Sequence, residues 1–451
     1  MRDGEISLAQ AAAWCGGTVA ANHAGITFHG ANFDTRRLRP GELFVALCGA
    51  RDGHDFAADA IKKGAAAVLA SRPLAPEIPA VYVRDTIIAL QAIAAEYRKT
   101  LPLKSVGITG SVGKTTTKEM IAAVLETAFL TEKTAENFNN GIGLPVTVLG
   151  LRQDCEAAVL EMGMNHFGEL SVLTRIAQPD VAVITNIGTM HIENLGSREG
   201  ILKAKLELLE GLRPGGTVIF NGDDDLLRTV REKYHAKCFG LSPDCDVRAE
   251  NICASESEIR FTAVAGELRF PVRLPVAGKH NVLNALAAIA VGLELQVPTA
   301  GIQAGLAGFH NTGMRQRIYL LRGMTVIEDC YNAGPESMRA ALQVLKDTKT
   351  SGRRIAVLGG MLELGDHAPA AHDQVGRAAA QCADLLFAYG ANAEAYVRGA
   401  EESGISAQLY PTHEALADAL LRTAKPGDVL LVKGSRGMRM ERVLELLKEK
   451  K

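Results

Sequence analysis

The chain has 451 residues, of which 47% are hydrophobic and 22% charged, and its 49 basic and 51 acidic residues give a formal net charge of −2. This composition is typical of a globular protein and excludes a disordered or fibrous chain. The near balance of charge excludes a general attraction to nucleic acid or to a membrane surface, so an anionic substrate has to be held by local basic groups. At roughly 100–200 residues per domain, two to four domains are expected.

Membrane and targeting signals are missing from the sequence. No stretch approaches the roughly 18 uninterrupted apolar residues that span a bilayer, and the first residues lead into an alanine-rich amphipathic segment, unlike a signal peptide. The eight cysteines form no C-x-x-C pair, so neither a zinc site nor a redox dithiol is indicated. We expect a cytoplasmic monomer with no membrane span, whose thiols are small buried hydrophobic groups in a reducing compartment.

The first hundred residues alternate short strands with helices. Their patterns predict strands over 43–47, 66–70 and 81–83, and helices over 55–63 and 87–100. Proline resists continuing a helix, so Pro102 marks a linker after the last of these helices. We therefore expect a first domain over residues 1–102.

The next section repeats strand and helix over residues 103–312. Strands are predicted over 105–109, 157–161 and 181–185, and helices over 114–127, 168–176, 199–211 and 281–293. Strands that alternate with helices imply a parallel sheet covered on both faces. Around 246–274 the pattern changes to consecutive strands, which predicts an antiparallel insert or edge.

The last section, residues 313–451, returns to the α/β pattern. Strands are predicted over 325–328, 354–358, 385–389 and 429–432, with helices between them and a charged amphipathic helix at the end. The sequence therefore predicts three α/β domains in series.

A glycine loop between the strand over 105–109 and the helix from 114 carries the main chemical signal. It is formed by Gly110, Ser111, Val112, Gly113, Lys114, Thr115 and Thr116. Glycines let backbone N–H groups converge on phosphate oxygens, the lysine suits the β- and γ-phosphates, and the hydroxyl suits Mg²⁺. The strict pattern has a further glycine where Ile108 stands, so the match is to a shortened variant. The alternative is a plain glycine turn, which does not require this strand–loop–helix context.

Two polar residues follow predicted strands of the same domain. Glu161 ends the strand over 157–161, where a carboxylate points into the ligand crevice of a parallel sheet and suits a Mg²⁺ ligand. His191 follows the strand over 181–185, and a neutral imidazole can bind a metal. The alternatives are an exposed strand-end carboxylate and a capping or packing histidine.

The helix predicted over 199–211 contains a lysine on its apolar face. At 100° per residue, Lys205 falls between Leu202 and Ile201, whereas Lys203 lies on the opposite side among glutamates and is expected to be solvated and ion-paired. A lysine on the inward face is costly unless it is paired, modified or part of a site. The alternative is that its stem lies along the helix flank with the ammonium in water.

Three further residues are candidates for contacting a nucleotide. Asn284 lies near the start of a helix, where the alternative is side-chain capping together with Asn281. Asp329 ends the strand over 325–328 and precedes a turn. Either Arg315 or Arg317, which both follow the second predicted linker near residue 313, is placed to reach a phosphate, although isolated arginines are more often surface charges.

Several segments taken together resemble the Mur ligase family, which builds the peptide stem of bacterial cell-wall precursors. The resemblance covers essentially the whole chain. It is carried by the glycine loop, Asn137-Phe138-Asn139-Asn140-Gly141-Ile142-Gly143-Leu144-Pro145, Glu161-Met162-Gly163, Gly188-Thr189-Met190-His191-Ile192-Glu193-Asn194-Leu195-Gly196-Ser197 and Gly359-Gly360-Met361-Leu362-Glu363-Leu364-Gly365. It implies a three-domain α/β fold with a central P-loop parallel-sheet domain and a C-terminal Rossmann-like domain.

The resemblance also implies a role for each matching residue. Lys114 would contact the β- and γ-phosphates of ATP, and Lys205 would be a carbamylated lysine that helps to bind a second Mg²⁺. The Mg²⁺ ligands would be Thr115, Glu161, His191 and Lys205, and further ATP contacts would come from Asn284, Arg315 and Asp329. On the substrate side, Asp34-Thr35-Arg36 and Gly53-His54-Asp55-Phe56 would contact the uridine nucleotide. The other substrate contacts would come from Asn137, Asn139 and Asn140, and from Asn332, Lys433 and Ser435 in the last domain.

The implied reaction is an ATP-dependent ligation through an acyl phosphate. UDP-N-acetylmuramoyl-tripeptide would be activated at its terminal carboxylate and joined to D-alanyl-D-alanine, with no nucleic acid involved. Separate domains that close would keep water from the acyl phosphate. The alternatives are a sister ligase that adds the third amino acid, a folylpolyglutamate synthetase-like ligase, and a P-loop switch or binding module that forms no peptide bond.

Overall fold

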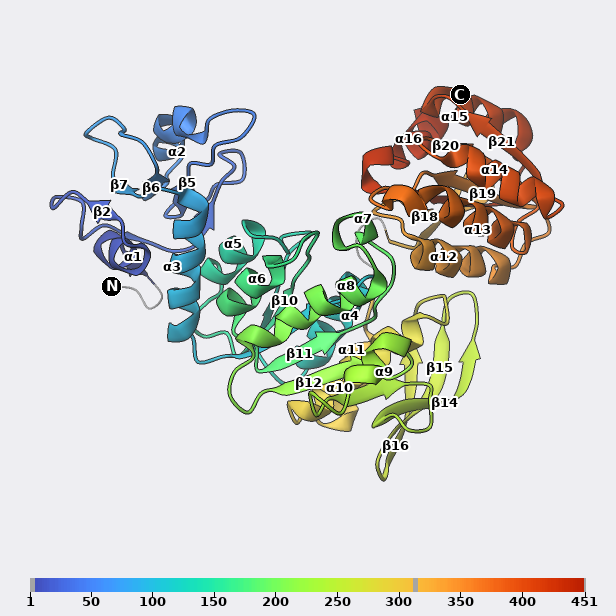
Figure 1. Ribbon diagram of the computed structural model, residues 1–451, viewed down its shortest axis with the longest axis horizontal. Helices are drawn as coiled ribbons and strands as arrows, with labels where there is room; N and C mark the ends of the chain where they lie inside the picture. The colour runs from blue at the N-terminus through green and yellow to red at the C-terminus, as the bar shows by residue number, and fades with distance from the viewer. Residues whose placement is uncertain (1–4, 311–314, 450–451) are drawn as a thin grey trace.

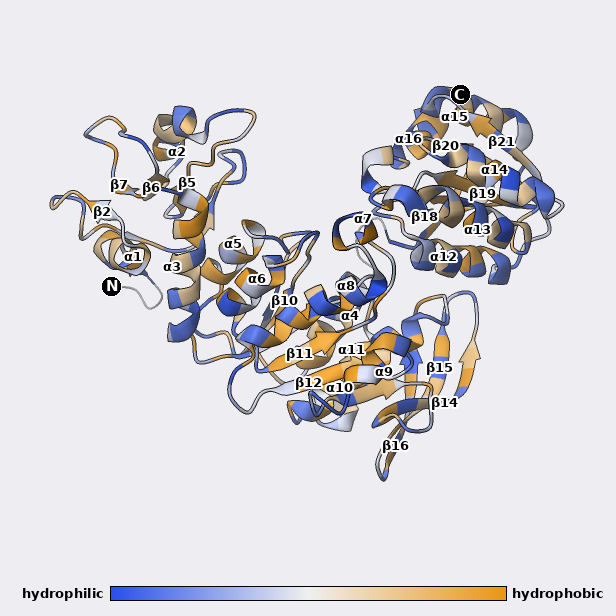
Figure 2. Ribbon diagram, in the orientation of Figure 1, coloured by the Kyte–Doolittle hydropathy of each residue, from blue (hydrophilic) through white to orange (hydrophobic). Residues whose placement is uncertain are grey.

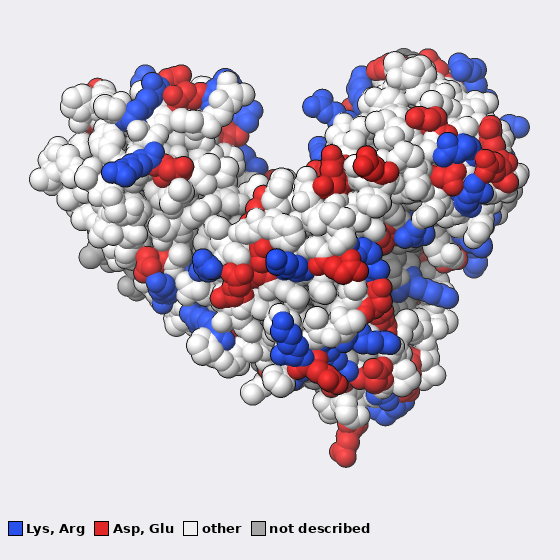
Figure 3. Space-filling view, in the orientation of Figure 1, with Lys and Arg blue, Asp and Glu red and all other residues white. Residues whose placement is uncertain are grey.

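The computed structural model describes residues 5–310 and 315–449, which fold into three α/β domains in a row, each built around its own sheet (Figure 1). The N-terminal and C-terminal domains lie at opposite ends of the central domain and project to the same side of it (Figure 1). The space-filling view shows a wide cleft between the N-terminal and C-terminal domains, above the central domain (Figure 3). Within the described ranges, no helix is long and apolar enough to cross a membrane.

The N-terminal domain contains a five-stranded sheet in the order β2-β7-β6-β5-β4 and a small antiparallel pair, β1-β3. The helix predicted over 55–63 is in fact a 3₁₀ turn, Gly53–Phe56, followed by a shorter α-helix, because the Asp52 side chain caps an earlier start at His54. The elements are β1 (Ile6–Ser7), α1 (Leu8–Cys15), β2 (Thr18–Val19), β3 (Thr27–Phe28), β4 (Ala31–Asn32), β5 (Leu43–Val45), α2 (Ala57–Lys62), β6 (Ala67–Ala70), β7 (Ala80–Tyr82) and α3 (Thr86–Thr100).

The central domain has a nine-stranded sheet in the order β16-β15-β14-β13-β12-β11-β8-β10-β9. Its strands β8–β14 pair in parallel, and β14, β15 and β16 form the predicted antiparallel edge. The strands are β8 (Lys104–Thr109), β9 (Thr131–Lys133), β10 (Ala157–Glu161), β11 (Val181–Ile184), β12 (Thr217–Asn221), β13 (Lys237–Gly240), β14 (Val247–Ala254), β15 (Ile259–Ala265) and β16 (Leu268–Leu274).

The central parallel strands β8, β10 and β11 are buried on both faces, which explains why they are continuous apolar runs (Figure 2), whereas the edge strand β16 alternates exposed and buried residues. In β10, Val159 packs into a core with α4 and α10, whereas Leu160 packs into a core on the opposite face.

The helix predicted over 199–211 ends as an α-helix at Leu206 and continues as a 3₁₀ turn over Glu207–Gly211, and α11 was not predicted. The helices are α4 (Lys114–Leu125), α5 (Gly143–Leu149), α6 (Glu169–Ala177), α7 (Ile192–Leu195), α8 (Arg198–Leu206), α9 (Asp225–Val230), α10 (Asn281–Glu294) and α11 (Thr299–Ala307).

The C-terminal domain is a six-stranded sheet in the order β17-β18-β22-β19-β20-β21, parallel except for the edge strand β17. Alternate residues of β22 enter different cores: Leu431 faces α12 and α13, and Leu430 faces α15 and α16. Strands β17 and β21 were not predicted. The elements are β17 (Arg317–Leu321), β18 (Met324–Asp329), α12 (Pro335–Asp347), β19 (Arg354–Gly359), α13 (Ala368–Ala380), β20 (Leu385–Tyr389), α14 (Ala393–Glu402), β21 (Ser406–Tyr410), α15 (His413–Thr423), β22 (Val429–Lys433) and α16 (Glu441–Glu449).

The junction between the first two domains depends on a buried arginine. Helix α3 packs against α5 and α6 of the central domain, and near its end Arg98 is fully buried. The Arg98 guanidinium donates to the carbonyl of Ala177 at 3.0 Å, to that of Leu101 at 3.2 Å and to Ser105 Oγ at 3.0 Å. Burial lowers the pKa of Arg98 to about 10, so the side chain is still a cation at neutral pH.

We expect Arg98→Met to destabilise the protein by at least about 2 kcal/mol, because buried acceptors left without donors cost about 1–3 kcal/mol each. The midpoint of thermal or denaturant unfolding, followed by circular dichroism, measures the change. The matched control is Lys99→Met, since Lys99 is exposed and, within residues 5–310 and 315–449, pairs only with Glu96. Equal midpoints for the two variants would contradict this role of Arg98.

Candidate active site

A cavity of about 590 Å³ lies where the central and C-terminal domains meet. Predicted site residues from both of these domains line the cavity. From the central domain these include residues 111–117, Asn139, Asn140, Glu161, His191 and Asn284, and from the C-terminal domain Arg315, Asp329, Asn332, Glu336 and Lys433. The predicted residues Asp34, Thr35, Arg36, Gly110, Asn137, Lys205 and Ser435 are not among its lining residues.

The glycine loop joins β8 to α4, and its shape requires two of its glycines. Gly110 has φ of 156°, and a Cβ there would lie 1.8 Å from Thr185 Oγ1. Gly113 has φ of 83°, and a Cβ there would lie 2.8 Å from Asn284 Oδ1. A side chain at either position would therefore push the loop away from the neighbouring strand and helix.

Asn186, which follows β11, holds the loop from the side. Its Oδ1 accepts the Val112 N–H at 2.9 Å, and its Nδ2 donates to the Val112 carbonyl at 2.9 Å. Lys114 Nζ donates back to the carbonyl of Gly110 at 2.7 Å. Burial lowers the pKa of Lys114, while the Glu161 carboxylate partly opposes this effect. The loop is thus already formed around a partly buried amine at a helix N-terminus, the arrangement that binds phosphate.

Glu161 is a buried carboxylate at the carboxyl end of β10, with an exposed fraction of 2%. Its Oε2 accepts from Thr115 Oγ1 at 2.8 Å, and its Oε1 accepts from Asn139 Nδ2 at 2.8 Å. A hydroxyl and a carboxylate oxygen in contact are ligands that a hard cation such as Mg²⁺ prefers. The donor set present here therefore fits the metal that the sequence implied.

Lys118 is a buried residue beside this pair that the sequence analysis missed. Its exposed fraction is 1%, and Nζ donates to the Thr134 carbonyl at 2.6 Å, pairs with Glu119 at 3.0 Å and lies 3.9 Å from Glu161 Oε2. On the helical wheel Lys118 falls between Leu125 and Ala122, which are both buried. The inward-face argument used for Lys205 would have found it.

His191 begins helix α7 with a left-handed backbone, φ 64°. Its Nδ1 lies 2.5 Å from Oε2 of Glu363 in the C-terminal domain, and this contact lowers the pKa of the Glu363 carboxyl group. The histidine neither caps the helix with its side chain nor packs into a core. Glu363 lies in a motif that carries the family resemblance, but no role was predicted for it.

Lys205 is buried on the inner face of α8, with an exposed fraction of 2%, whereas Lys203 is exposed. Among the described residues no hydrogen bond or ion pair to Lys205 Nζ is found. Burial, assisted by the nearby Lys114 charge, lowers the pKa of Lys205 well below its ordinary value. The expected ion pairs of Lys203 are not found in the described part of the chain, where its ammonium lies 5.6 Å from the centre of the Phe167 ring.

Asn284 links two helices of the central domain and does not cap α10, whose N-cap residue is His280. Its Oδ1 accepts from Thr117 Oγ1 at 3.0 Å, and its Nδ2 donates to Asn281 Oδ1 at 2.9 Å. The capping alternative is therefore wrong. His280, also in the cavity wall, has its pKa lowered to about 4 by burial, so it presents a neutral imidazole.

The C-terminal side of the cavity is built on neighbouring parallel strands. Asp329 and Lys433 are partners in the β18–β22 register, and Lys433 Nζ contacts Asp329 Oδ2 at 2.6 Å and the Asn332 carbonyl at 2.9 Å. Ser435 Oγ donates to the Ala333 carbonyl at 3.2 Å and accepts the Leu362 N–H at 3.0 Å, so it holds two loops together. The guanidinium of Arg315 stacks 4.0 Å from the centre of the Tyr331 ring.

The predicted uridine-side residues lie at the junction of the N-terminal and central domains. Arg36 pairs with Asp34 at 2.6 Å and lowers the pKa of Asp34 to about 2. The next residue, Arg37, pairs with Glu136 at 2.9 Å, beside the loop that contains the predicted asparagines. The side chain of Asn140 accepts the Gly143 N–H at 2.9 Å, just where α5 begins. The structure therefore brings Arg37, next to residues 34–36, to the loop over 136–140, whose Asn139 contacts Glu161.

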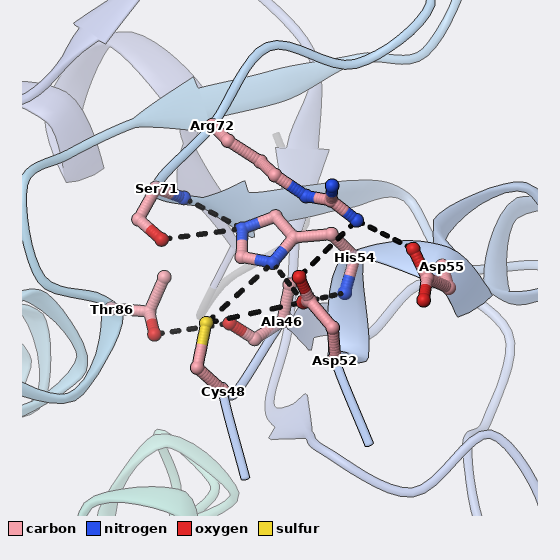
Figure 4. A network of polar contacts seen from close by, with 8 residues as sticks. All are labelled: Ala46, Cys48, Asp52, His54, Asp55, Ser71, Arg72 and Thr86. Atoms are coloured by element: carbon pink, nitrogen blue, oxygen red, sulfur yellow. Dashed lines mark hydrogen bonds and ion pairs between the residues drawn. The ribbon is translucent and has the colours of Figure 1, made fainter.

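His54, in the motif assigned to the uridine side, is buried in a polar network (Figure 4). Its Nε2 accepts the Ser71 N–H at 2.9 Å, so Nδ1 carries the proton and donates to Asp52 Oδ1 at 2.6 Å. Cys48 Sγ lies 4.0 Å from the same Nδ1. The group Cys48, Asp52 and His54 has the composition of a metal site, but its histidine offers no free lone pair, so its role is to fix the loop.

Comparison with known proteins agrees with this architecture. Family models match at residues 27–98 (Mur ligase family, catalytic domain), 108–292 (Mur ligase middle domain) and 314–436 (Mur ligase, glutamate ligase domain). The chain is 43% identical to the UDP-N-acetylmuramoyl-tripeptide–D-alanyl-D-alanine ligase of Bacillus subtilis, with 93% of each chain covered.

Solved structures show the same likeness. MurF from Acinetobacter baumannii superposes with a TM-score of 0.90 at 33% identity, covering 99% of both chains. MurF from Thermotoga maritima in complex with ADP gives 0.81 at 30% identity, covering 93% of this chain and 97% of that one. A UDP-N-acetylmuramoyl-L-alanyl-D-glutamate–2,6-diaminopimelate ligase and FolC of Escherichia coli, each at 18% identity, share the fold alone. This chain belongs to the Mur ligase family.

Proposed function

We propose that the chain is an ATP-dependent amide ligase that joins D-alanyl-D-alanine to UDP-N-acetylmuramoyl-tripeptide in peptidoglycan precursor synthesis, with ADP and phosphate as products. The names of the relatives at 33–43% identity support this reading over a third-residue ligase or a folylpolyglutamate synthetase. One observation carries it: the phosphate loop, Glu161 and His191 line the same cavity as Asp329, Asn332 and Lys433 of the C-terminal domain.

The ATP phosphates are assigned to the loop. Backbone N–H groups of Gly110, Ser111, Val112, Gly113, Lys114, Thr115 and Thr116 surround them, and the Lys114 amine turns from the Gly110 carbonyl to the β- and γ-phosphates. Asn284, Arg315 and Asp329 complete the nucleotide contacts. Lys114 stabilises the charge that develops during phosphoryl transfer, as a preorganised cation in a water-poor site.

The metal ligands are assigned to Thr115, Glu161, His191 and Lys205. Mg²⁺ held there would supply a Lewis acid next to the phosphates. Lys205 fits as a carbamate, because carbamylation needs a neutral amine, and burial favours the neutral form of Lys205. The modification would turn a buried amine without a partner into an anionic ligand.

In the first step the terminal carboxylate of the tripeptide attacks the γ-phosphorus of ATP, ADP leaves, and an acyl phosphate forms. The amine of D-alanyl-D-alanine then attacks the acyl carbon, and phosphate leaves with the C–O electron pair. Asp34, Thr35, Arg36, Asn137, Asn139 and Asn140 hold the UDP-sugar and stem, and Asn332, Lys433 and Ser435 face the incoming dipeptide. The joined walls of the cavity limit the access of water to the acyl phosphate.

We further propose domain limits of 1–102, 103–312 and 313–451; the second boundary falls outside the described residues. A monomer accounts for the site, since residues of one chain supply all the groups assigned here. The cytoplasm is the proposed location, where the nucleotide precursor and ATP meet. Eight free thiols agree with a reducing compartment, but the expectation that all are buried is wrong, because Cys48 and Cys253 are exposed.

We expect ATP-dependent ligation with D-alanyl-D-alanine and not with single amino acids. ADP release and mass spectrometry of the product measure it, with both the lysine-containing and the diaminopimelate-containing tripeptide as acceptors. Turnover with lysine or diaminopimelate on the UDP-dipeptide, and none with D-alanyl-D-alanine, would identify a third-residue ligase instead.

Lys205→Ala is expected to lose ligation by two orders of magnitude or more, and added short carboxylic acids should restore part of it by replacing the carbamate. Lys205→Met should also be inactive without any loss of thermal stability, because it removes a buried amine whose charged form is disfavoured. The matched control is Lys203→Ala, which should remain active. An active Lys205→Ala together with an inactive Lys203→Ala would reverse the assignment.

A further inference from the structure

Two carboxylates of the C-terminal domain contact one short loop of the central domain. Thr189 Oγ1 donates to Glu336 at 3.1 Å, and His191 Nδ1 contacts Glu363 Oε2 at 2.5 Å. The loop over 188–191 lies directly after β11 and beside the phosphate loop, where Gly188 N donates to Ser111 Oγ at 2.8 Å. The C-terminal domain therefore contacts the ATP site through a histidine that the proposed function gives to Mg²⁺.

The backbone on both sides of the His191–Glu363 contact is unusual. His191 has φ of 64° and Glu363 has φ of 62°, a left-handed conformation that residues other than glycine rarely adopt. The surrounding contacts hold both residues in place. Leu364, with an exposed fraction of 2%, lies in the same apolar core as Ile192, and the turn over Gly365–His367 packs against α7. Uncommon backbone geometry held by packing is a feature of functional positions.

The contact also fixes which nitrogen of His191 is available. An ionised carboxylate can only accept a hydrogen bond, so Nδ1 carries the proton that points at Glu363. The lone pair of the neutral ring is then on Nε2. Metal-binding histidines commonly have this arrangement, with one ring nitrogen on the metal and the other donating to a carboxylate.

We propose that Glu363 is a positioning residue that orients His191 and fixes its tautomer, so that Nε2 is the metal-binding nitrogen. This inference rests on the proposed function, in which His191 holds Mg²⁺. Because Glu363 belongs to the C-terminal domain and His191 to the central domain, the metal site is complete only when the two domains are docked through α7. The Glu363 side chain is half exposed, so its hydrogen bond to His191 adds little stability, and its contribution is directional.

The test is Mn²⁺ binding to the full chain in the presence of ADP, measured by electron paramagnetic resonance without tripeptide or dipeptide. We expect Glu363→Ala to weaken Mn²⁺ binding about 10-fold to 100-fold, the usual effect of removing the carboxylate partner of a metal-binding histidine. Glu363→Gln keeps an oxygen that accepts from Nδ1–H and should recover most of the affinity. Asp366→Ala, which removes an exposed carboxylate from the same loop, is the matched control and should bind Mn²⁺ normally.

A second measurement does not depend on the metal. The ¹⁵N shifts of His191, assigned with His191→Gln, should show a protonated Nδ1 and an unprotonated Nε2 in the native chain, and Glu363→Ala should lose this preference. Unchanged Mn²⁺ affinity in Glu363→Ala overturns the proposal. So does a raised KM for D-alanyl-D-alanine at normal Mn²⁺ affinity, which would assign Glu363 to the dipeptide.

The inference and the proposed function can fail separately. If His191→Ala leaves Mn²⁺ affinity unchanged, the role of Glu363 is overturned, while ligation of D-alanyl-D-alanine by the native chain still supports the proposed reaction. If the native chain does not ligate D-alanyl-D-alanine but Glu363→Ala still weakens Mn²⁺ binding, the reaction is wrong and the positioning role is supported.

Discussion

The contact on which the rest of the site depends is the one between Glu161 and its two donors, Thr115 and Asn139. Thr115 belongs to the phosphate loop. Asn139 belongs to the loop whose neighbours Glu136 and Phe138 meet Arg37 and Phe33 of the N-terminal domain. A single buried carboxylate thus connects the nucleotide side of the cavity to the domain that is expected to hold the sugar nucleotide.

Two amines of the central domain have lowered pKa values. Burial lowers the pKa of both Lys114 and Lys205, and the charge of Lys114 lowers the pKa of Lys205 further. A bound polyphosphate would stabilise the charged form of Lys114 and raise its pKa again. On the proposed function, binding of ATP and protonation of Lys114 are coupled, whereas burial still favours the neutral form of Lys205, which carbamylation requires.

Much of the fold could be predicted from the sequence because its strands are apolar runs that alternate with helices. The edge strands β17 and β21 were missed, since an exposed edge carries a weaker hydrophobic pattern. In β17, Leu320 is in fact 75% exposed. The helix over 199–211 was predicted too long as an α-helix, because its last turn changes to a 3₁₀ turn without any change in the pattern of charges and leucines.

Site residues could be predicted from the sequence where a single loop, strand or helix determines where the side chain lies. The phosphate loop, Glu161 at a strand end and the inward-facing Lys205 all follow from local geometry. The partners that come from distant segments were not predictable in this way: Asn186 on the loop, Glu363 on His191, and Lys433 on Asp329 meet only after the domains have folded together. Lys118 is the exception, because its place on the helix was available in the sequence and was overlooked.

The arginine at the end of α3 has a consequence for substrate choice. Arg98 binds carbonyl groups on both sides of the junction, and α3 packs against α5 and α6, so these contacts fix the place of the N-terminal domain on the central domain in this structure. The junction then sets the distance from residues 34–36 to the phosphate loop. On the proposed assignment, a stem peptide anchored by its nucleotide presents its terminal carboxylate to ATP only if it has the matching length. Such an enzyme would select the tripeptide over shorter stems by the length of the stem, without contacting the side chain of its last residue.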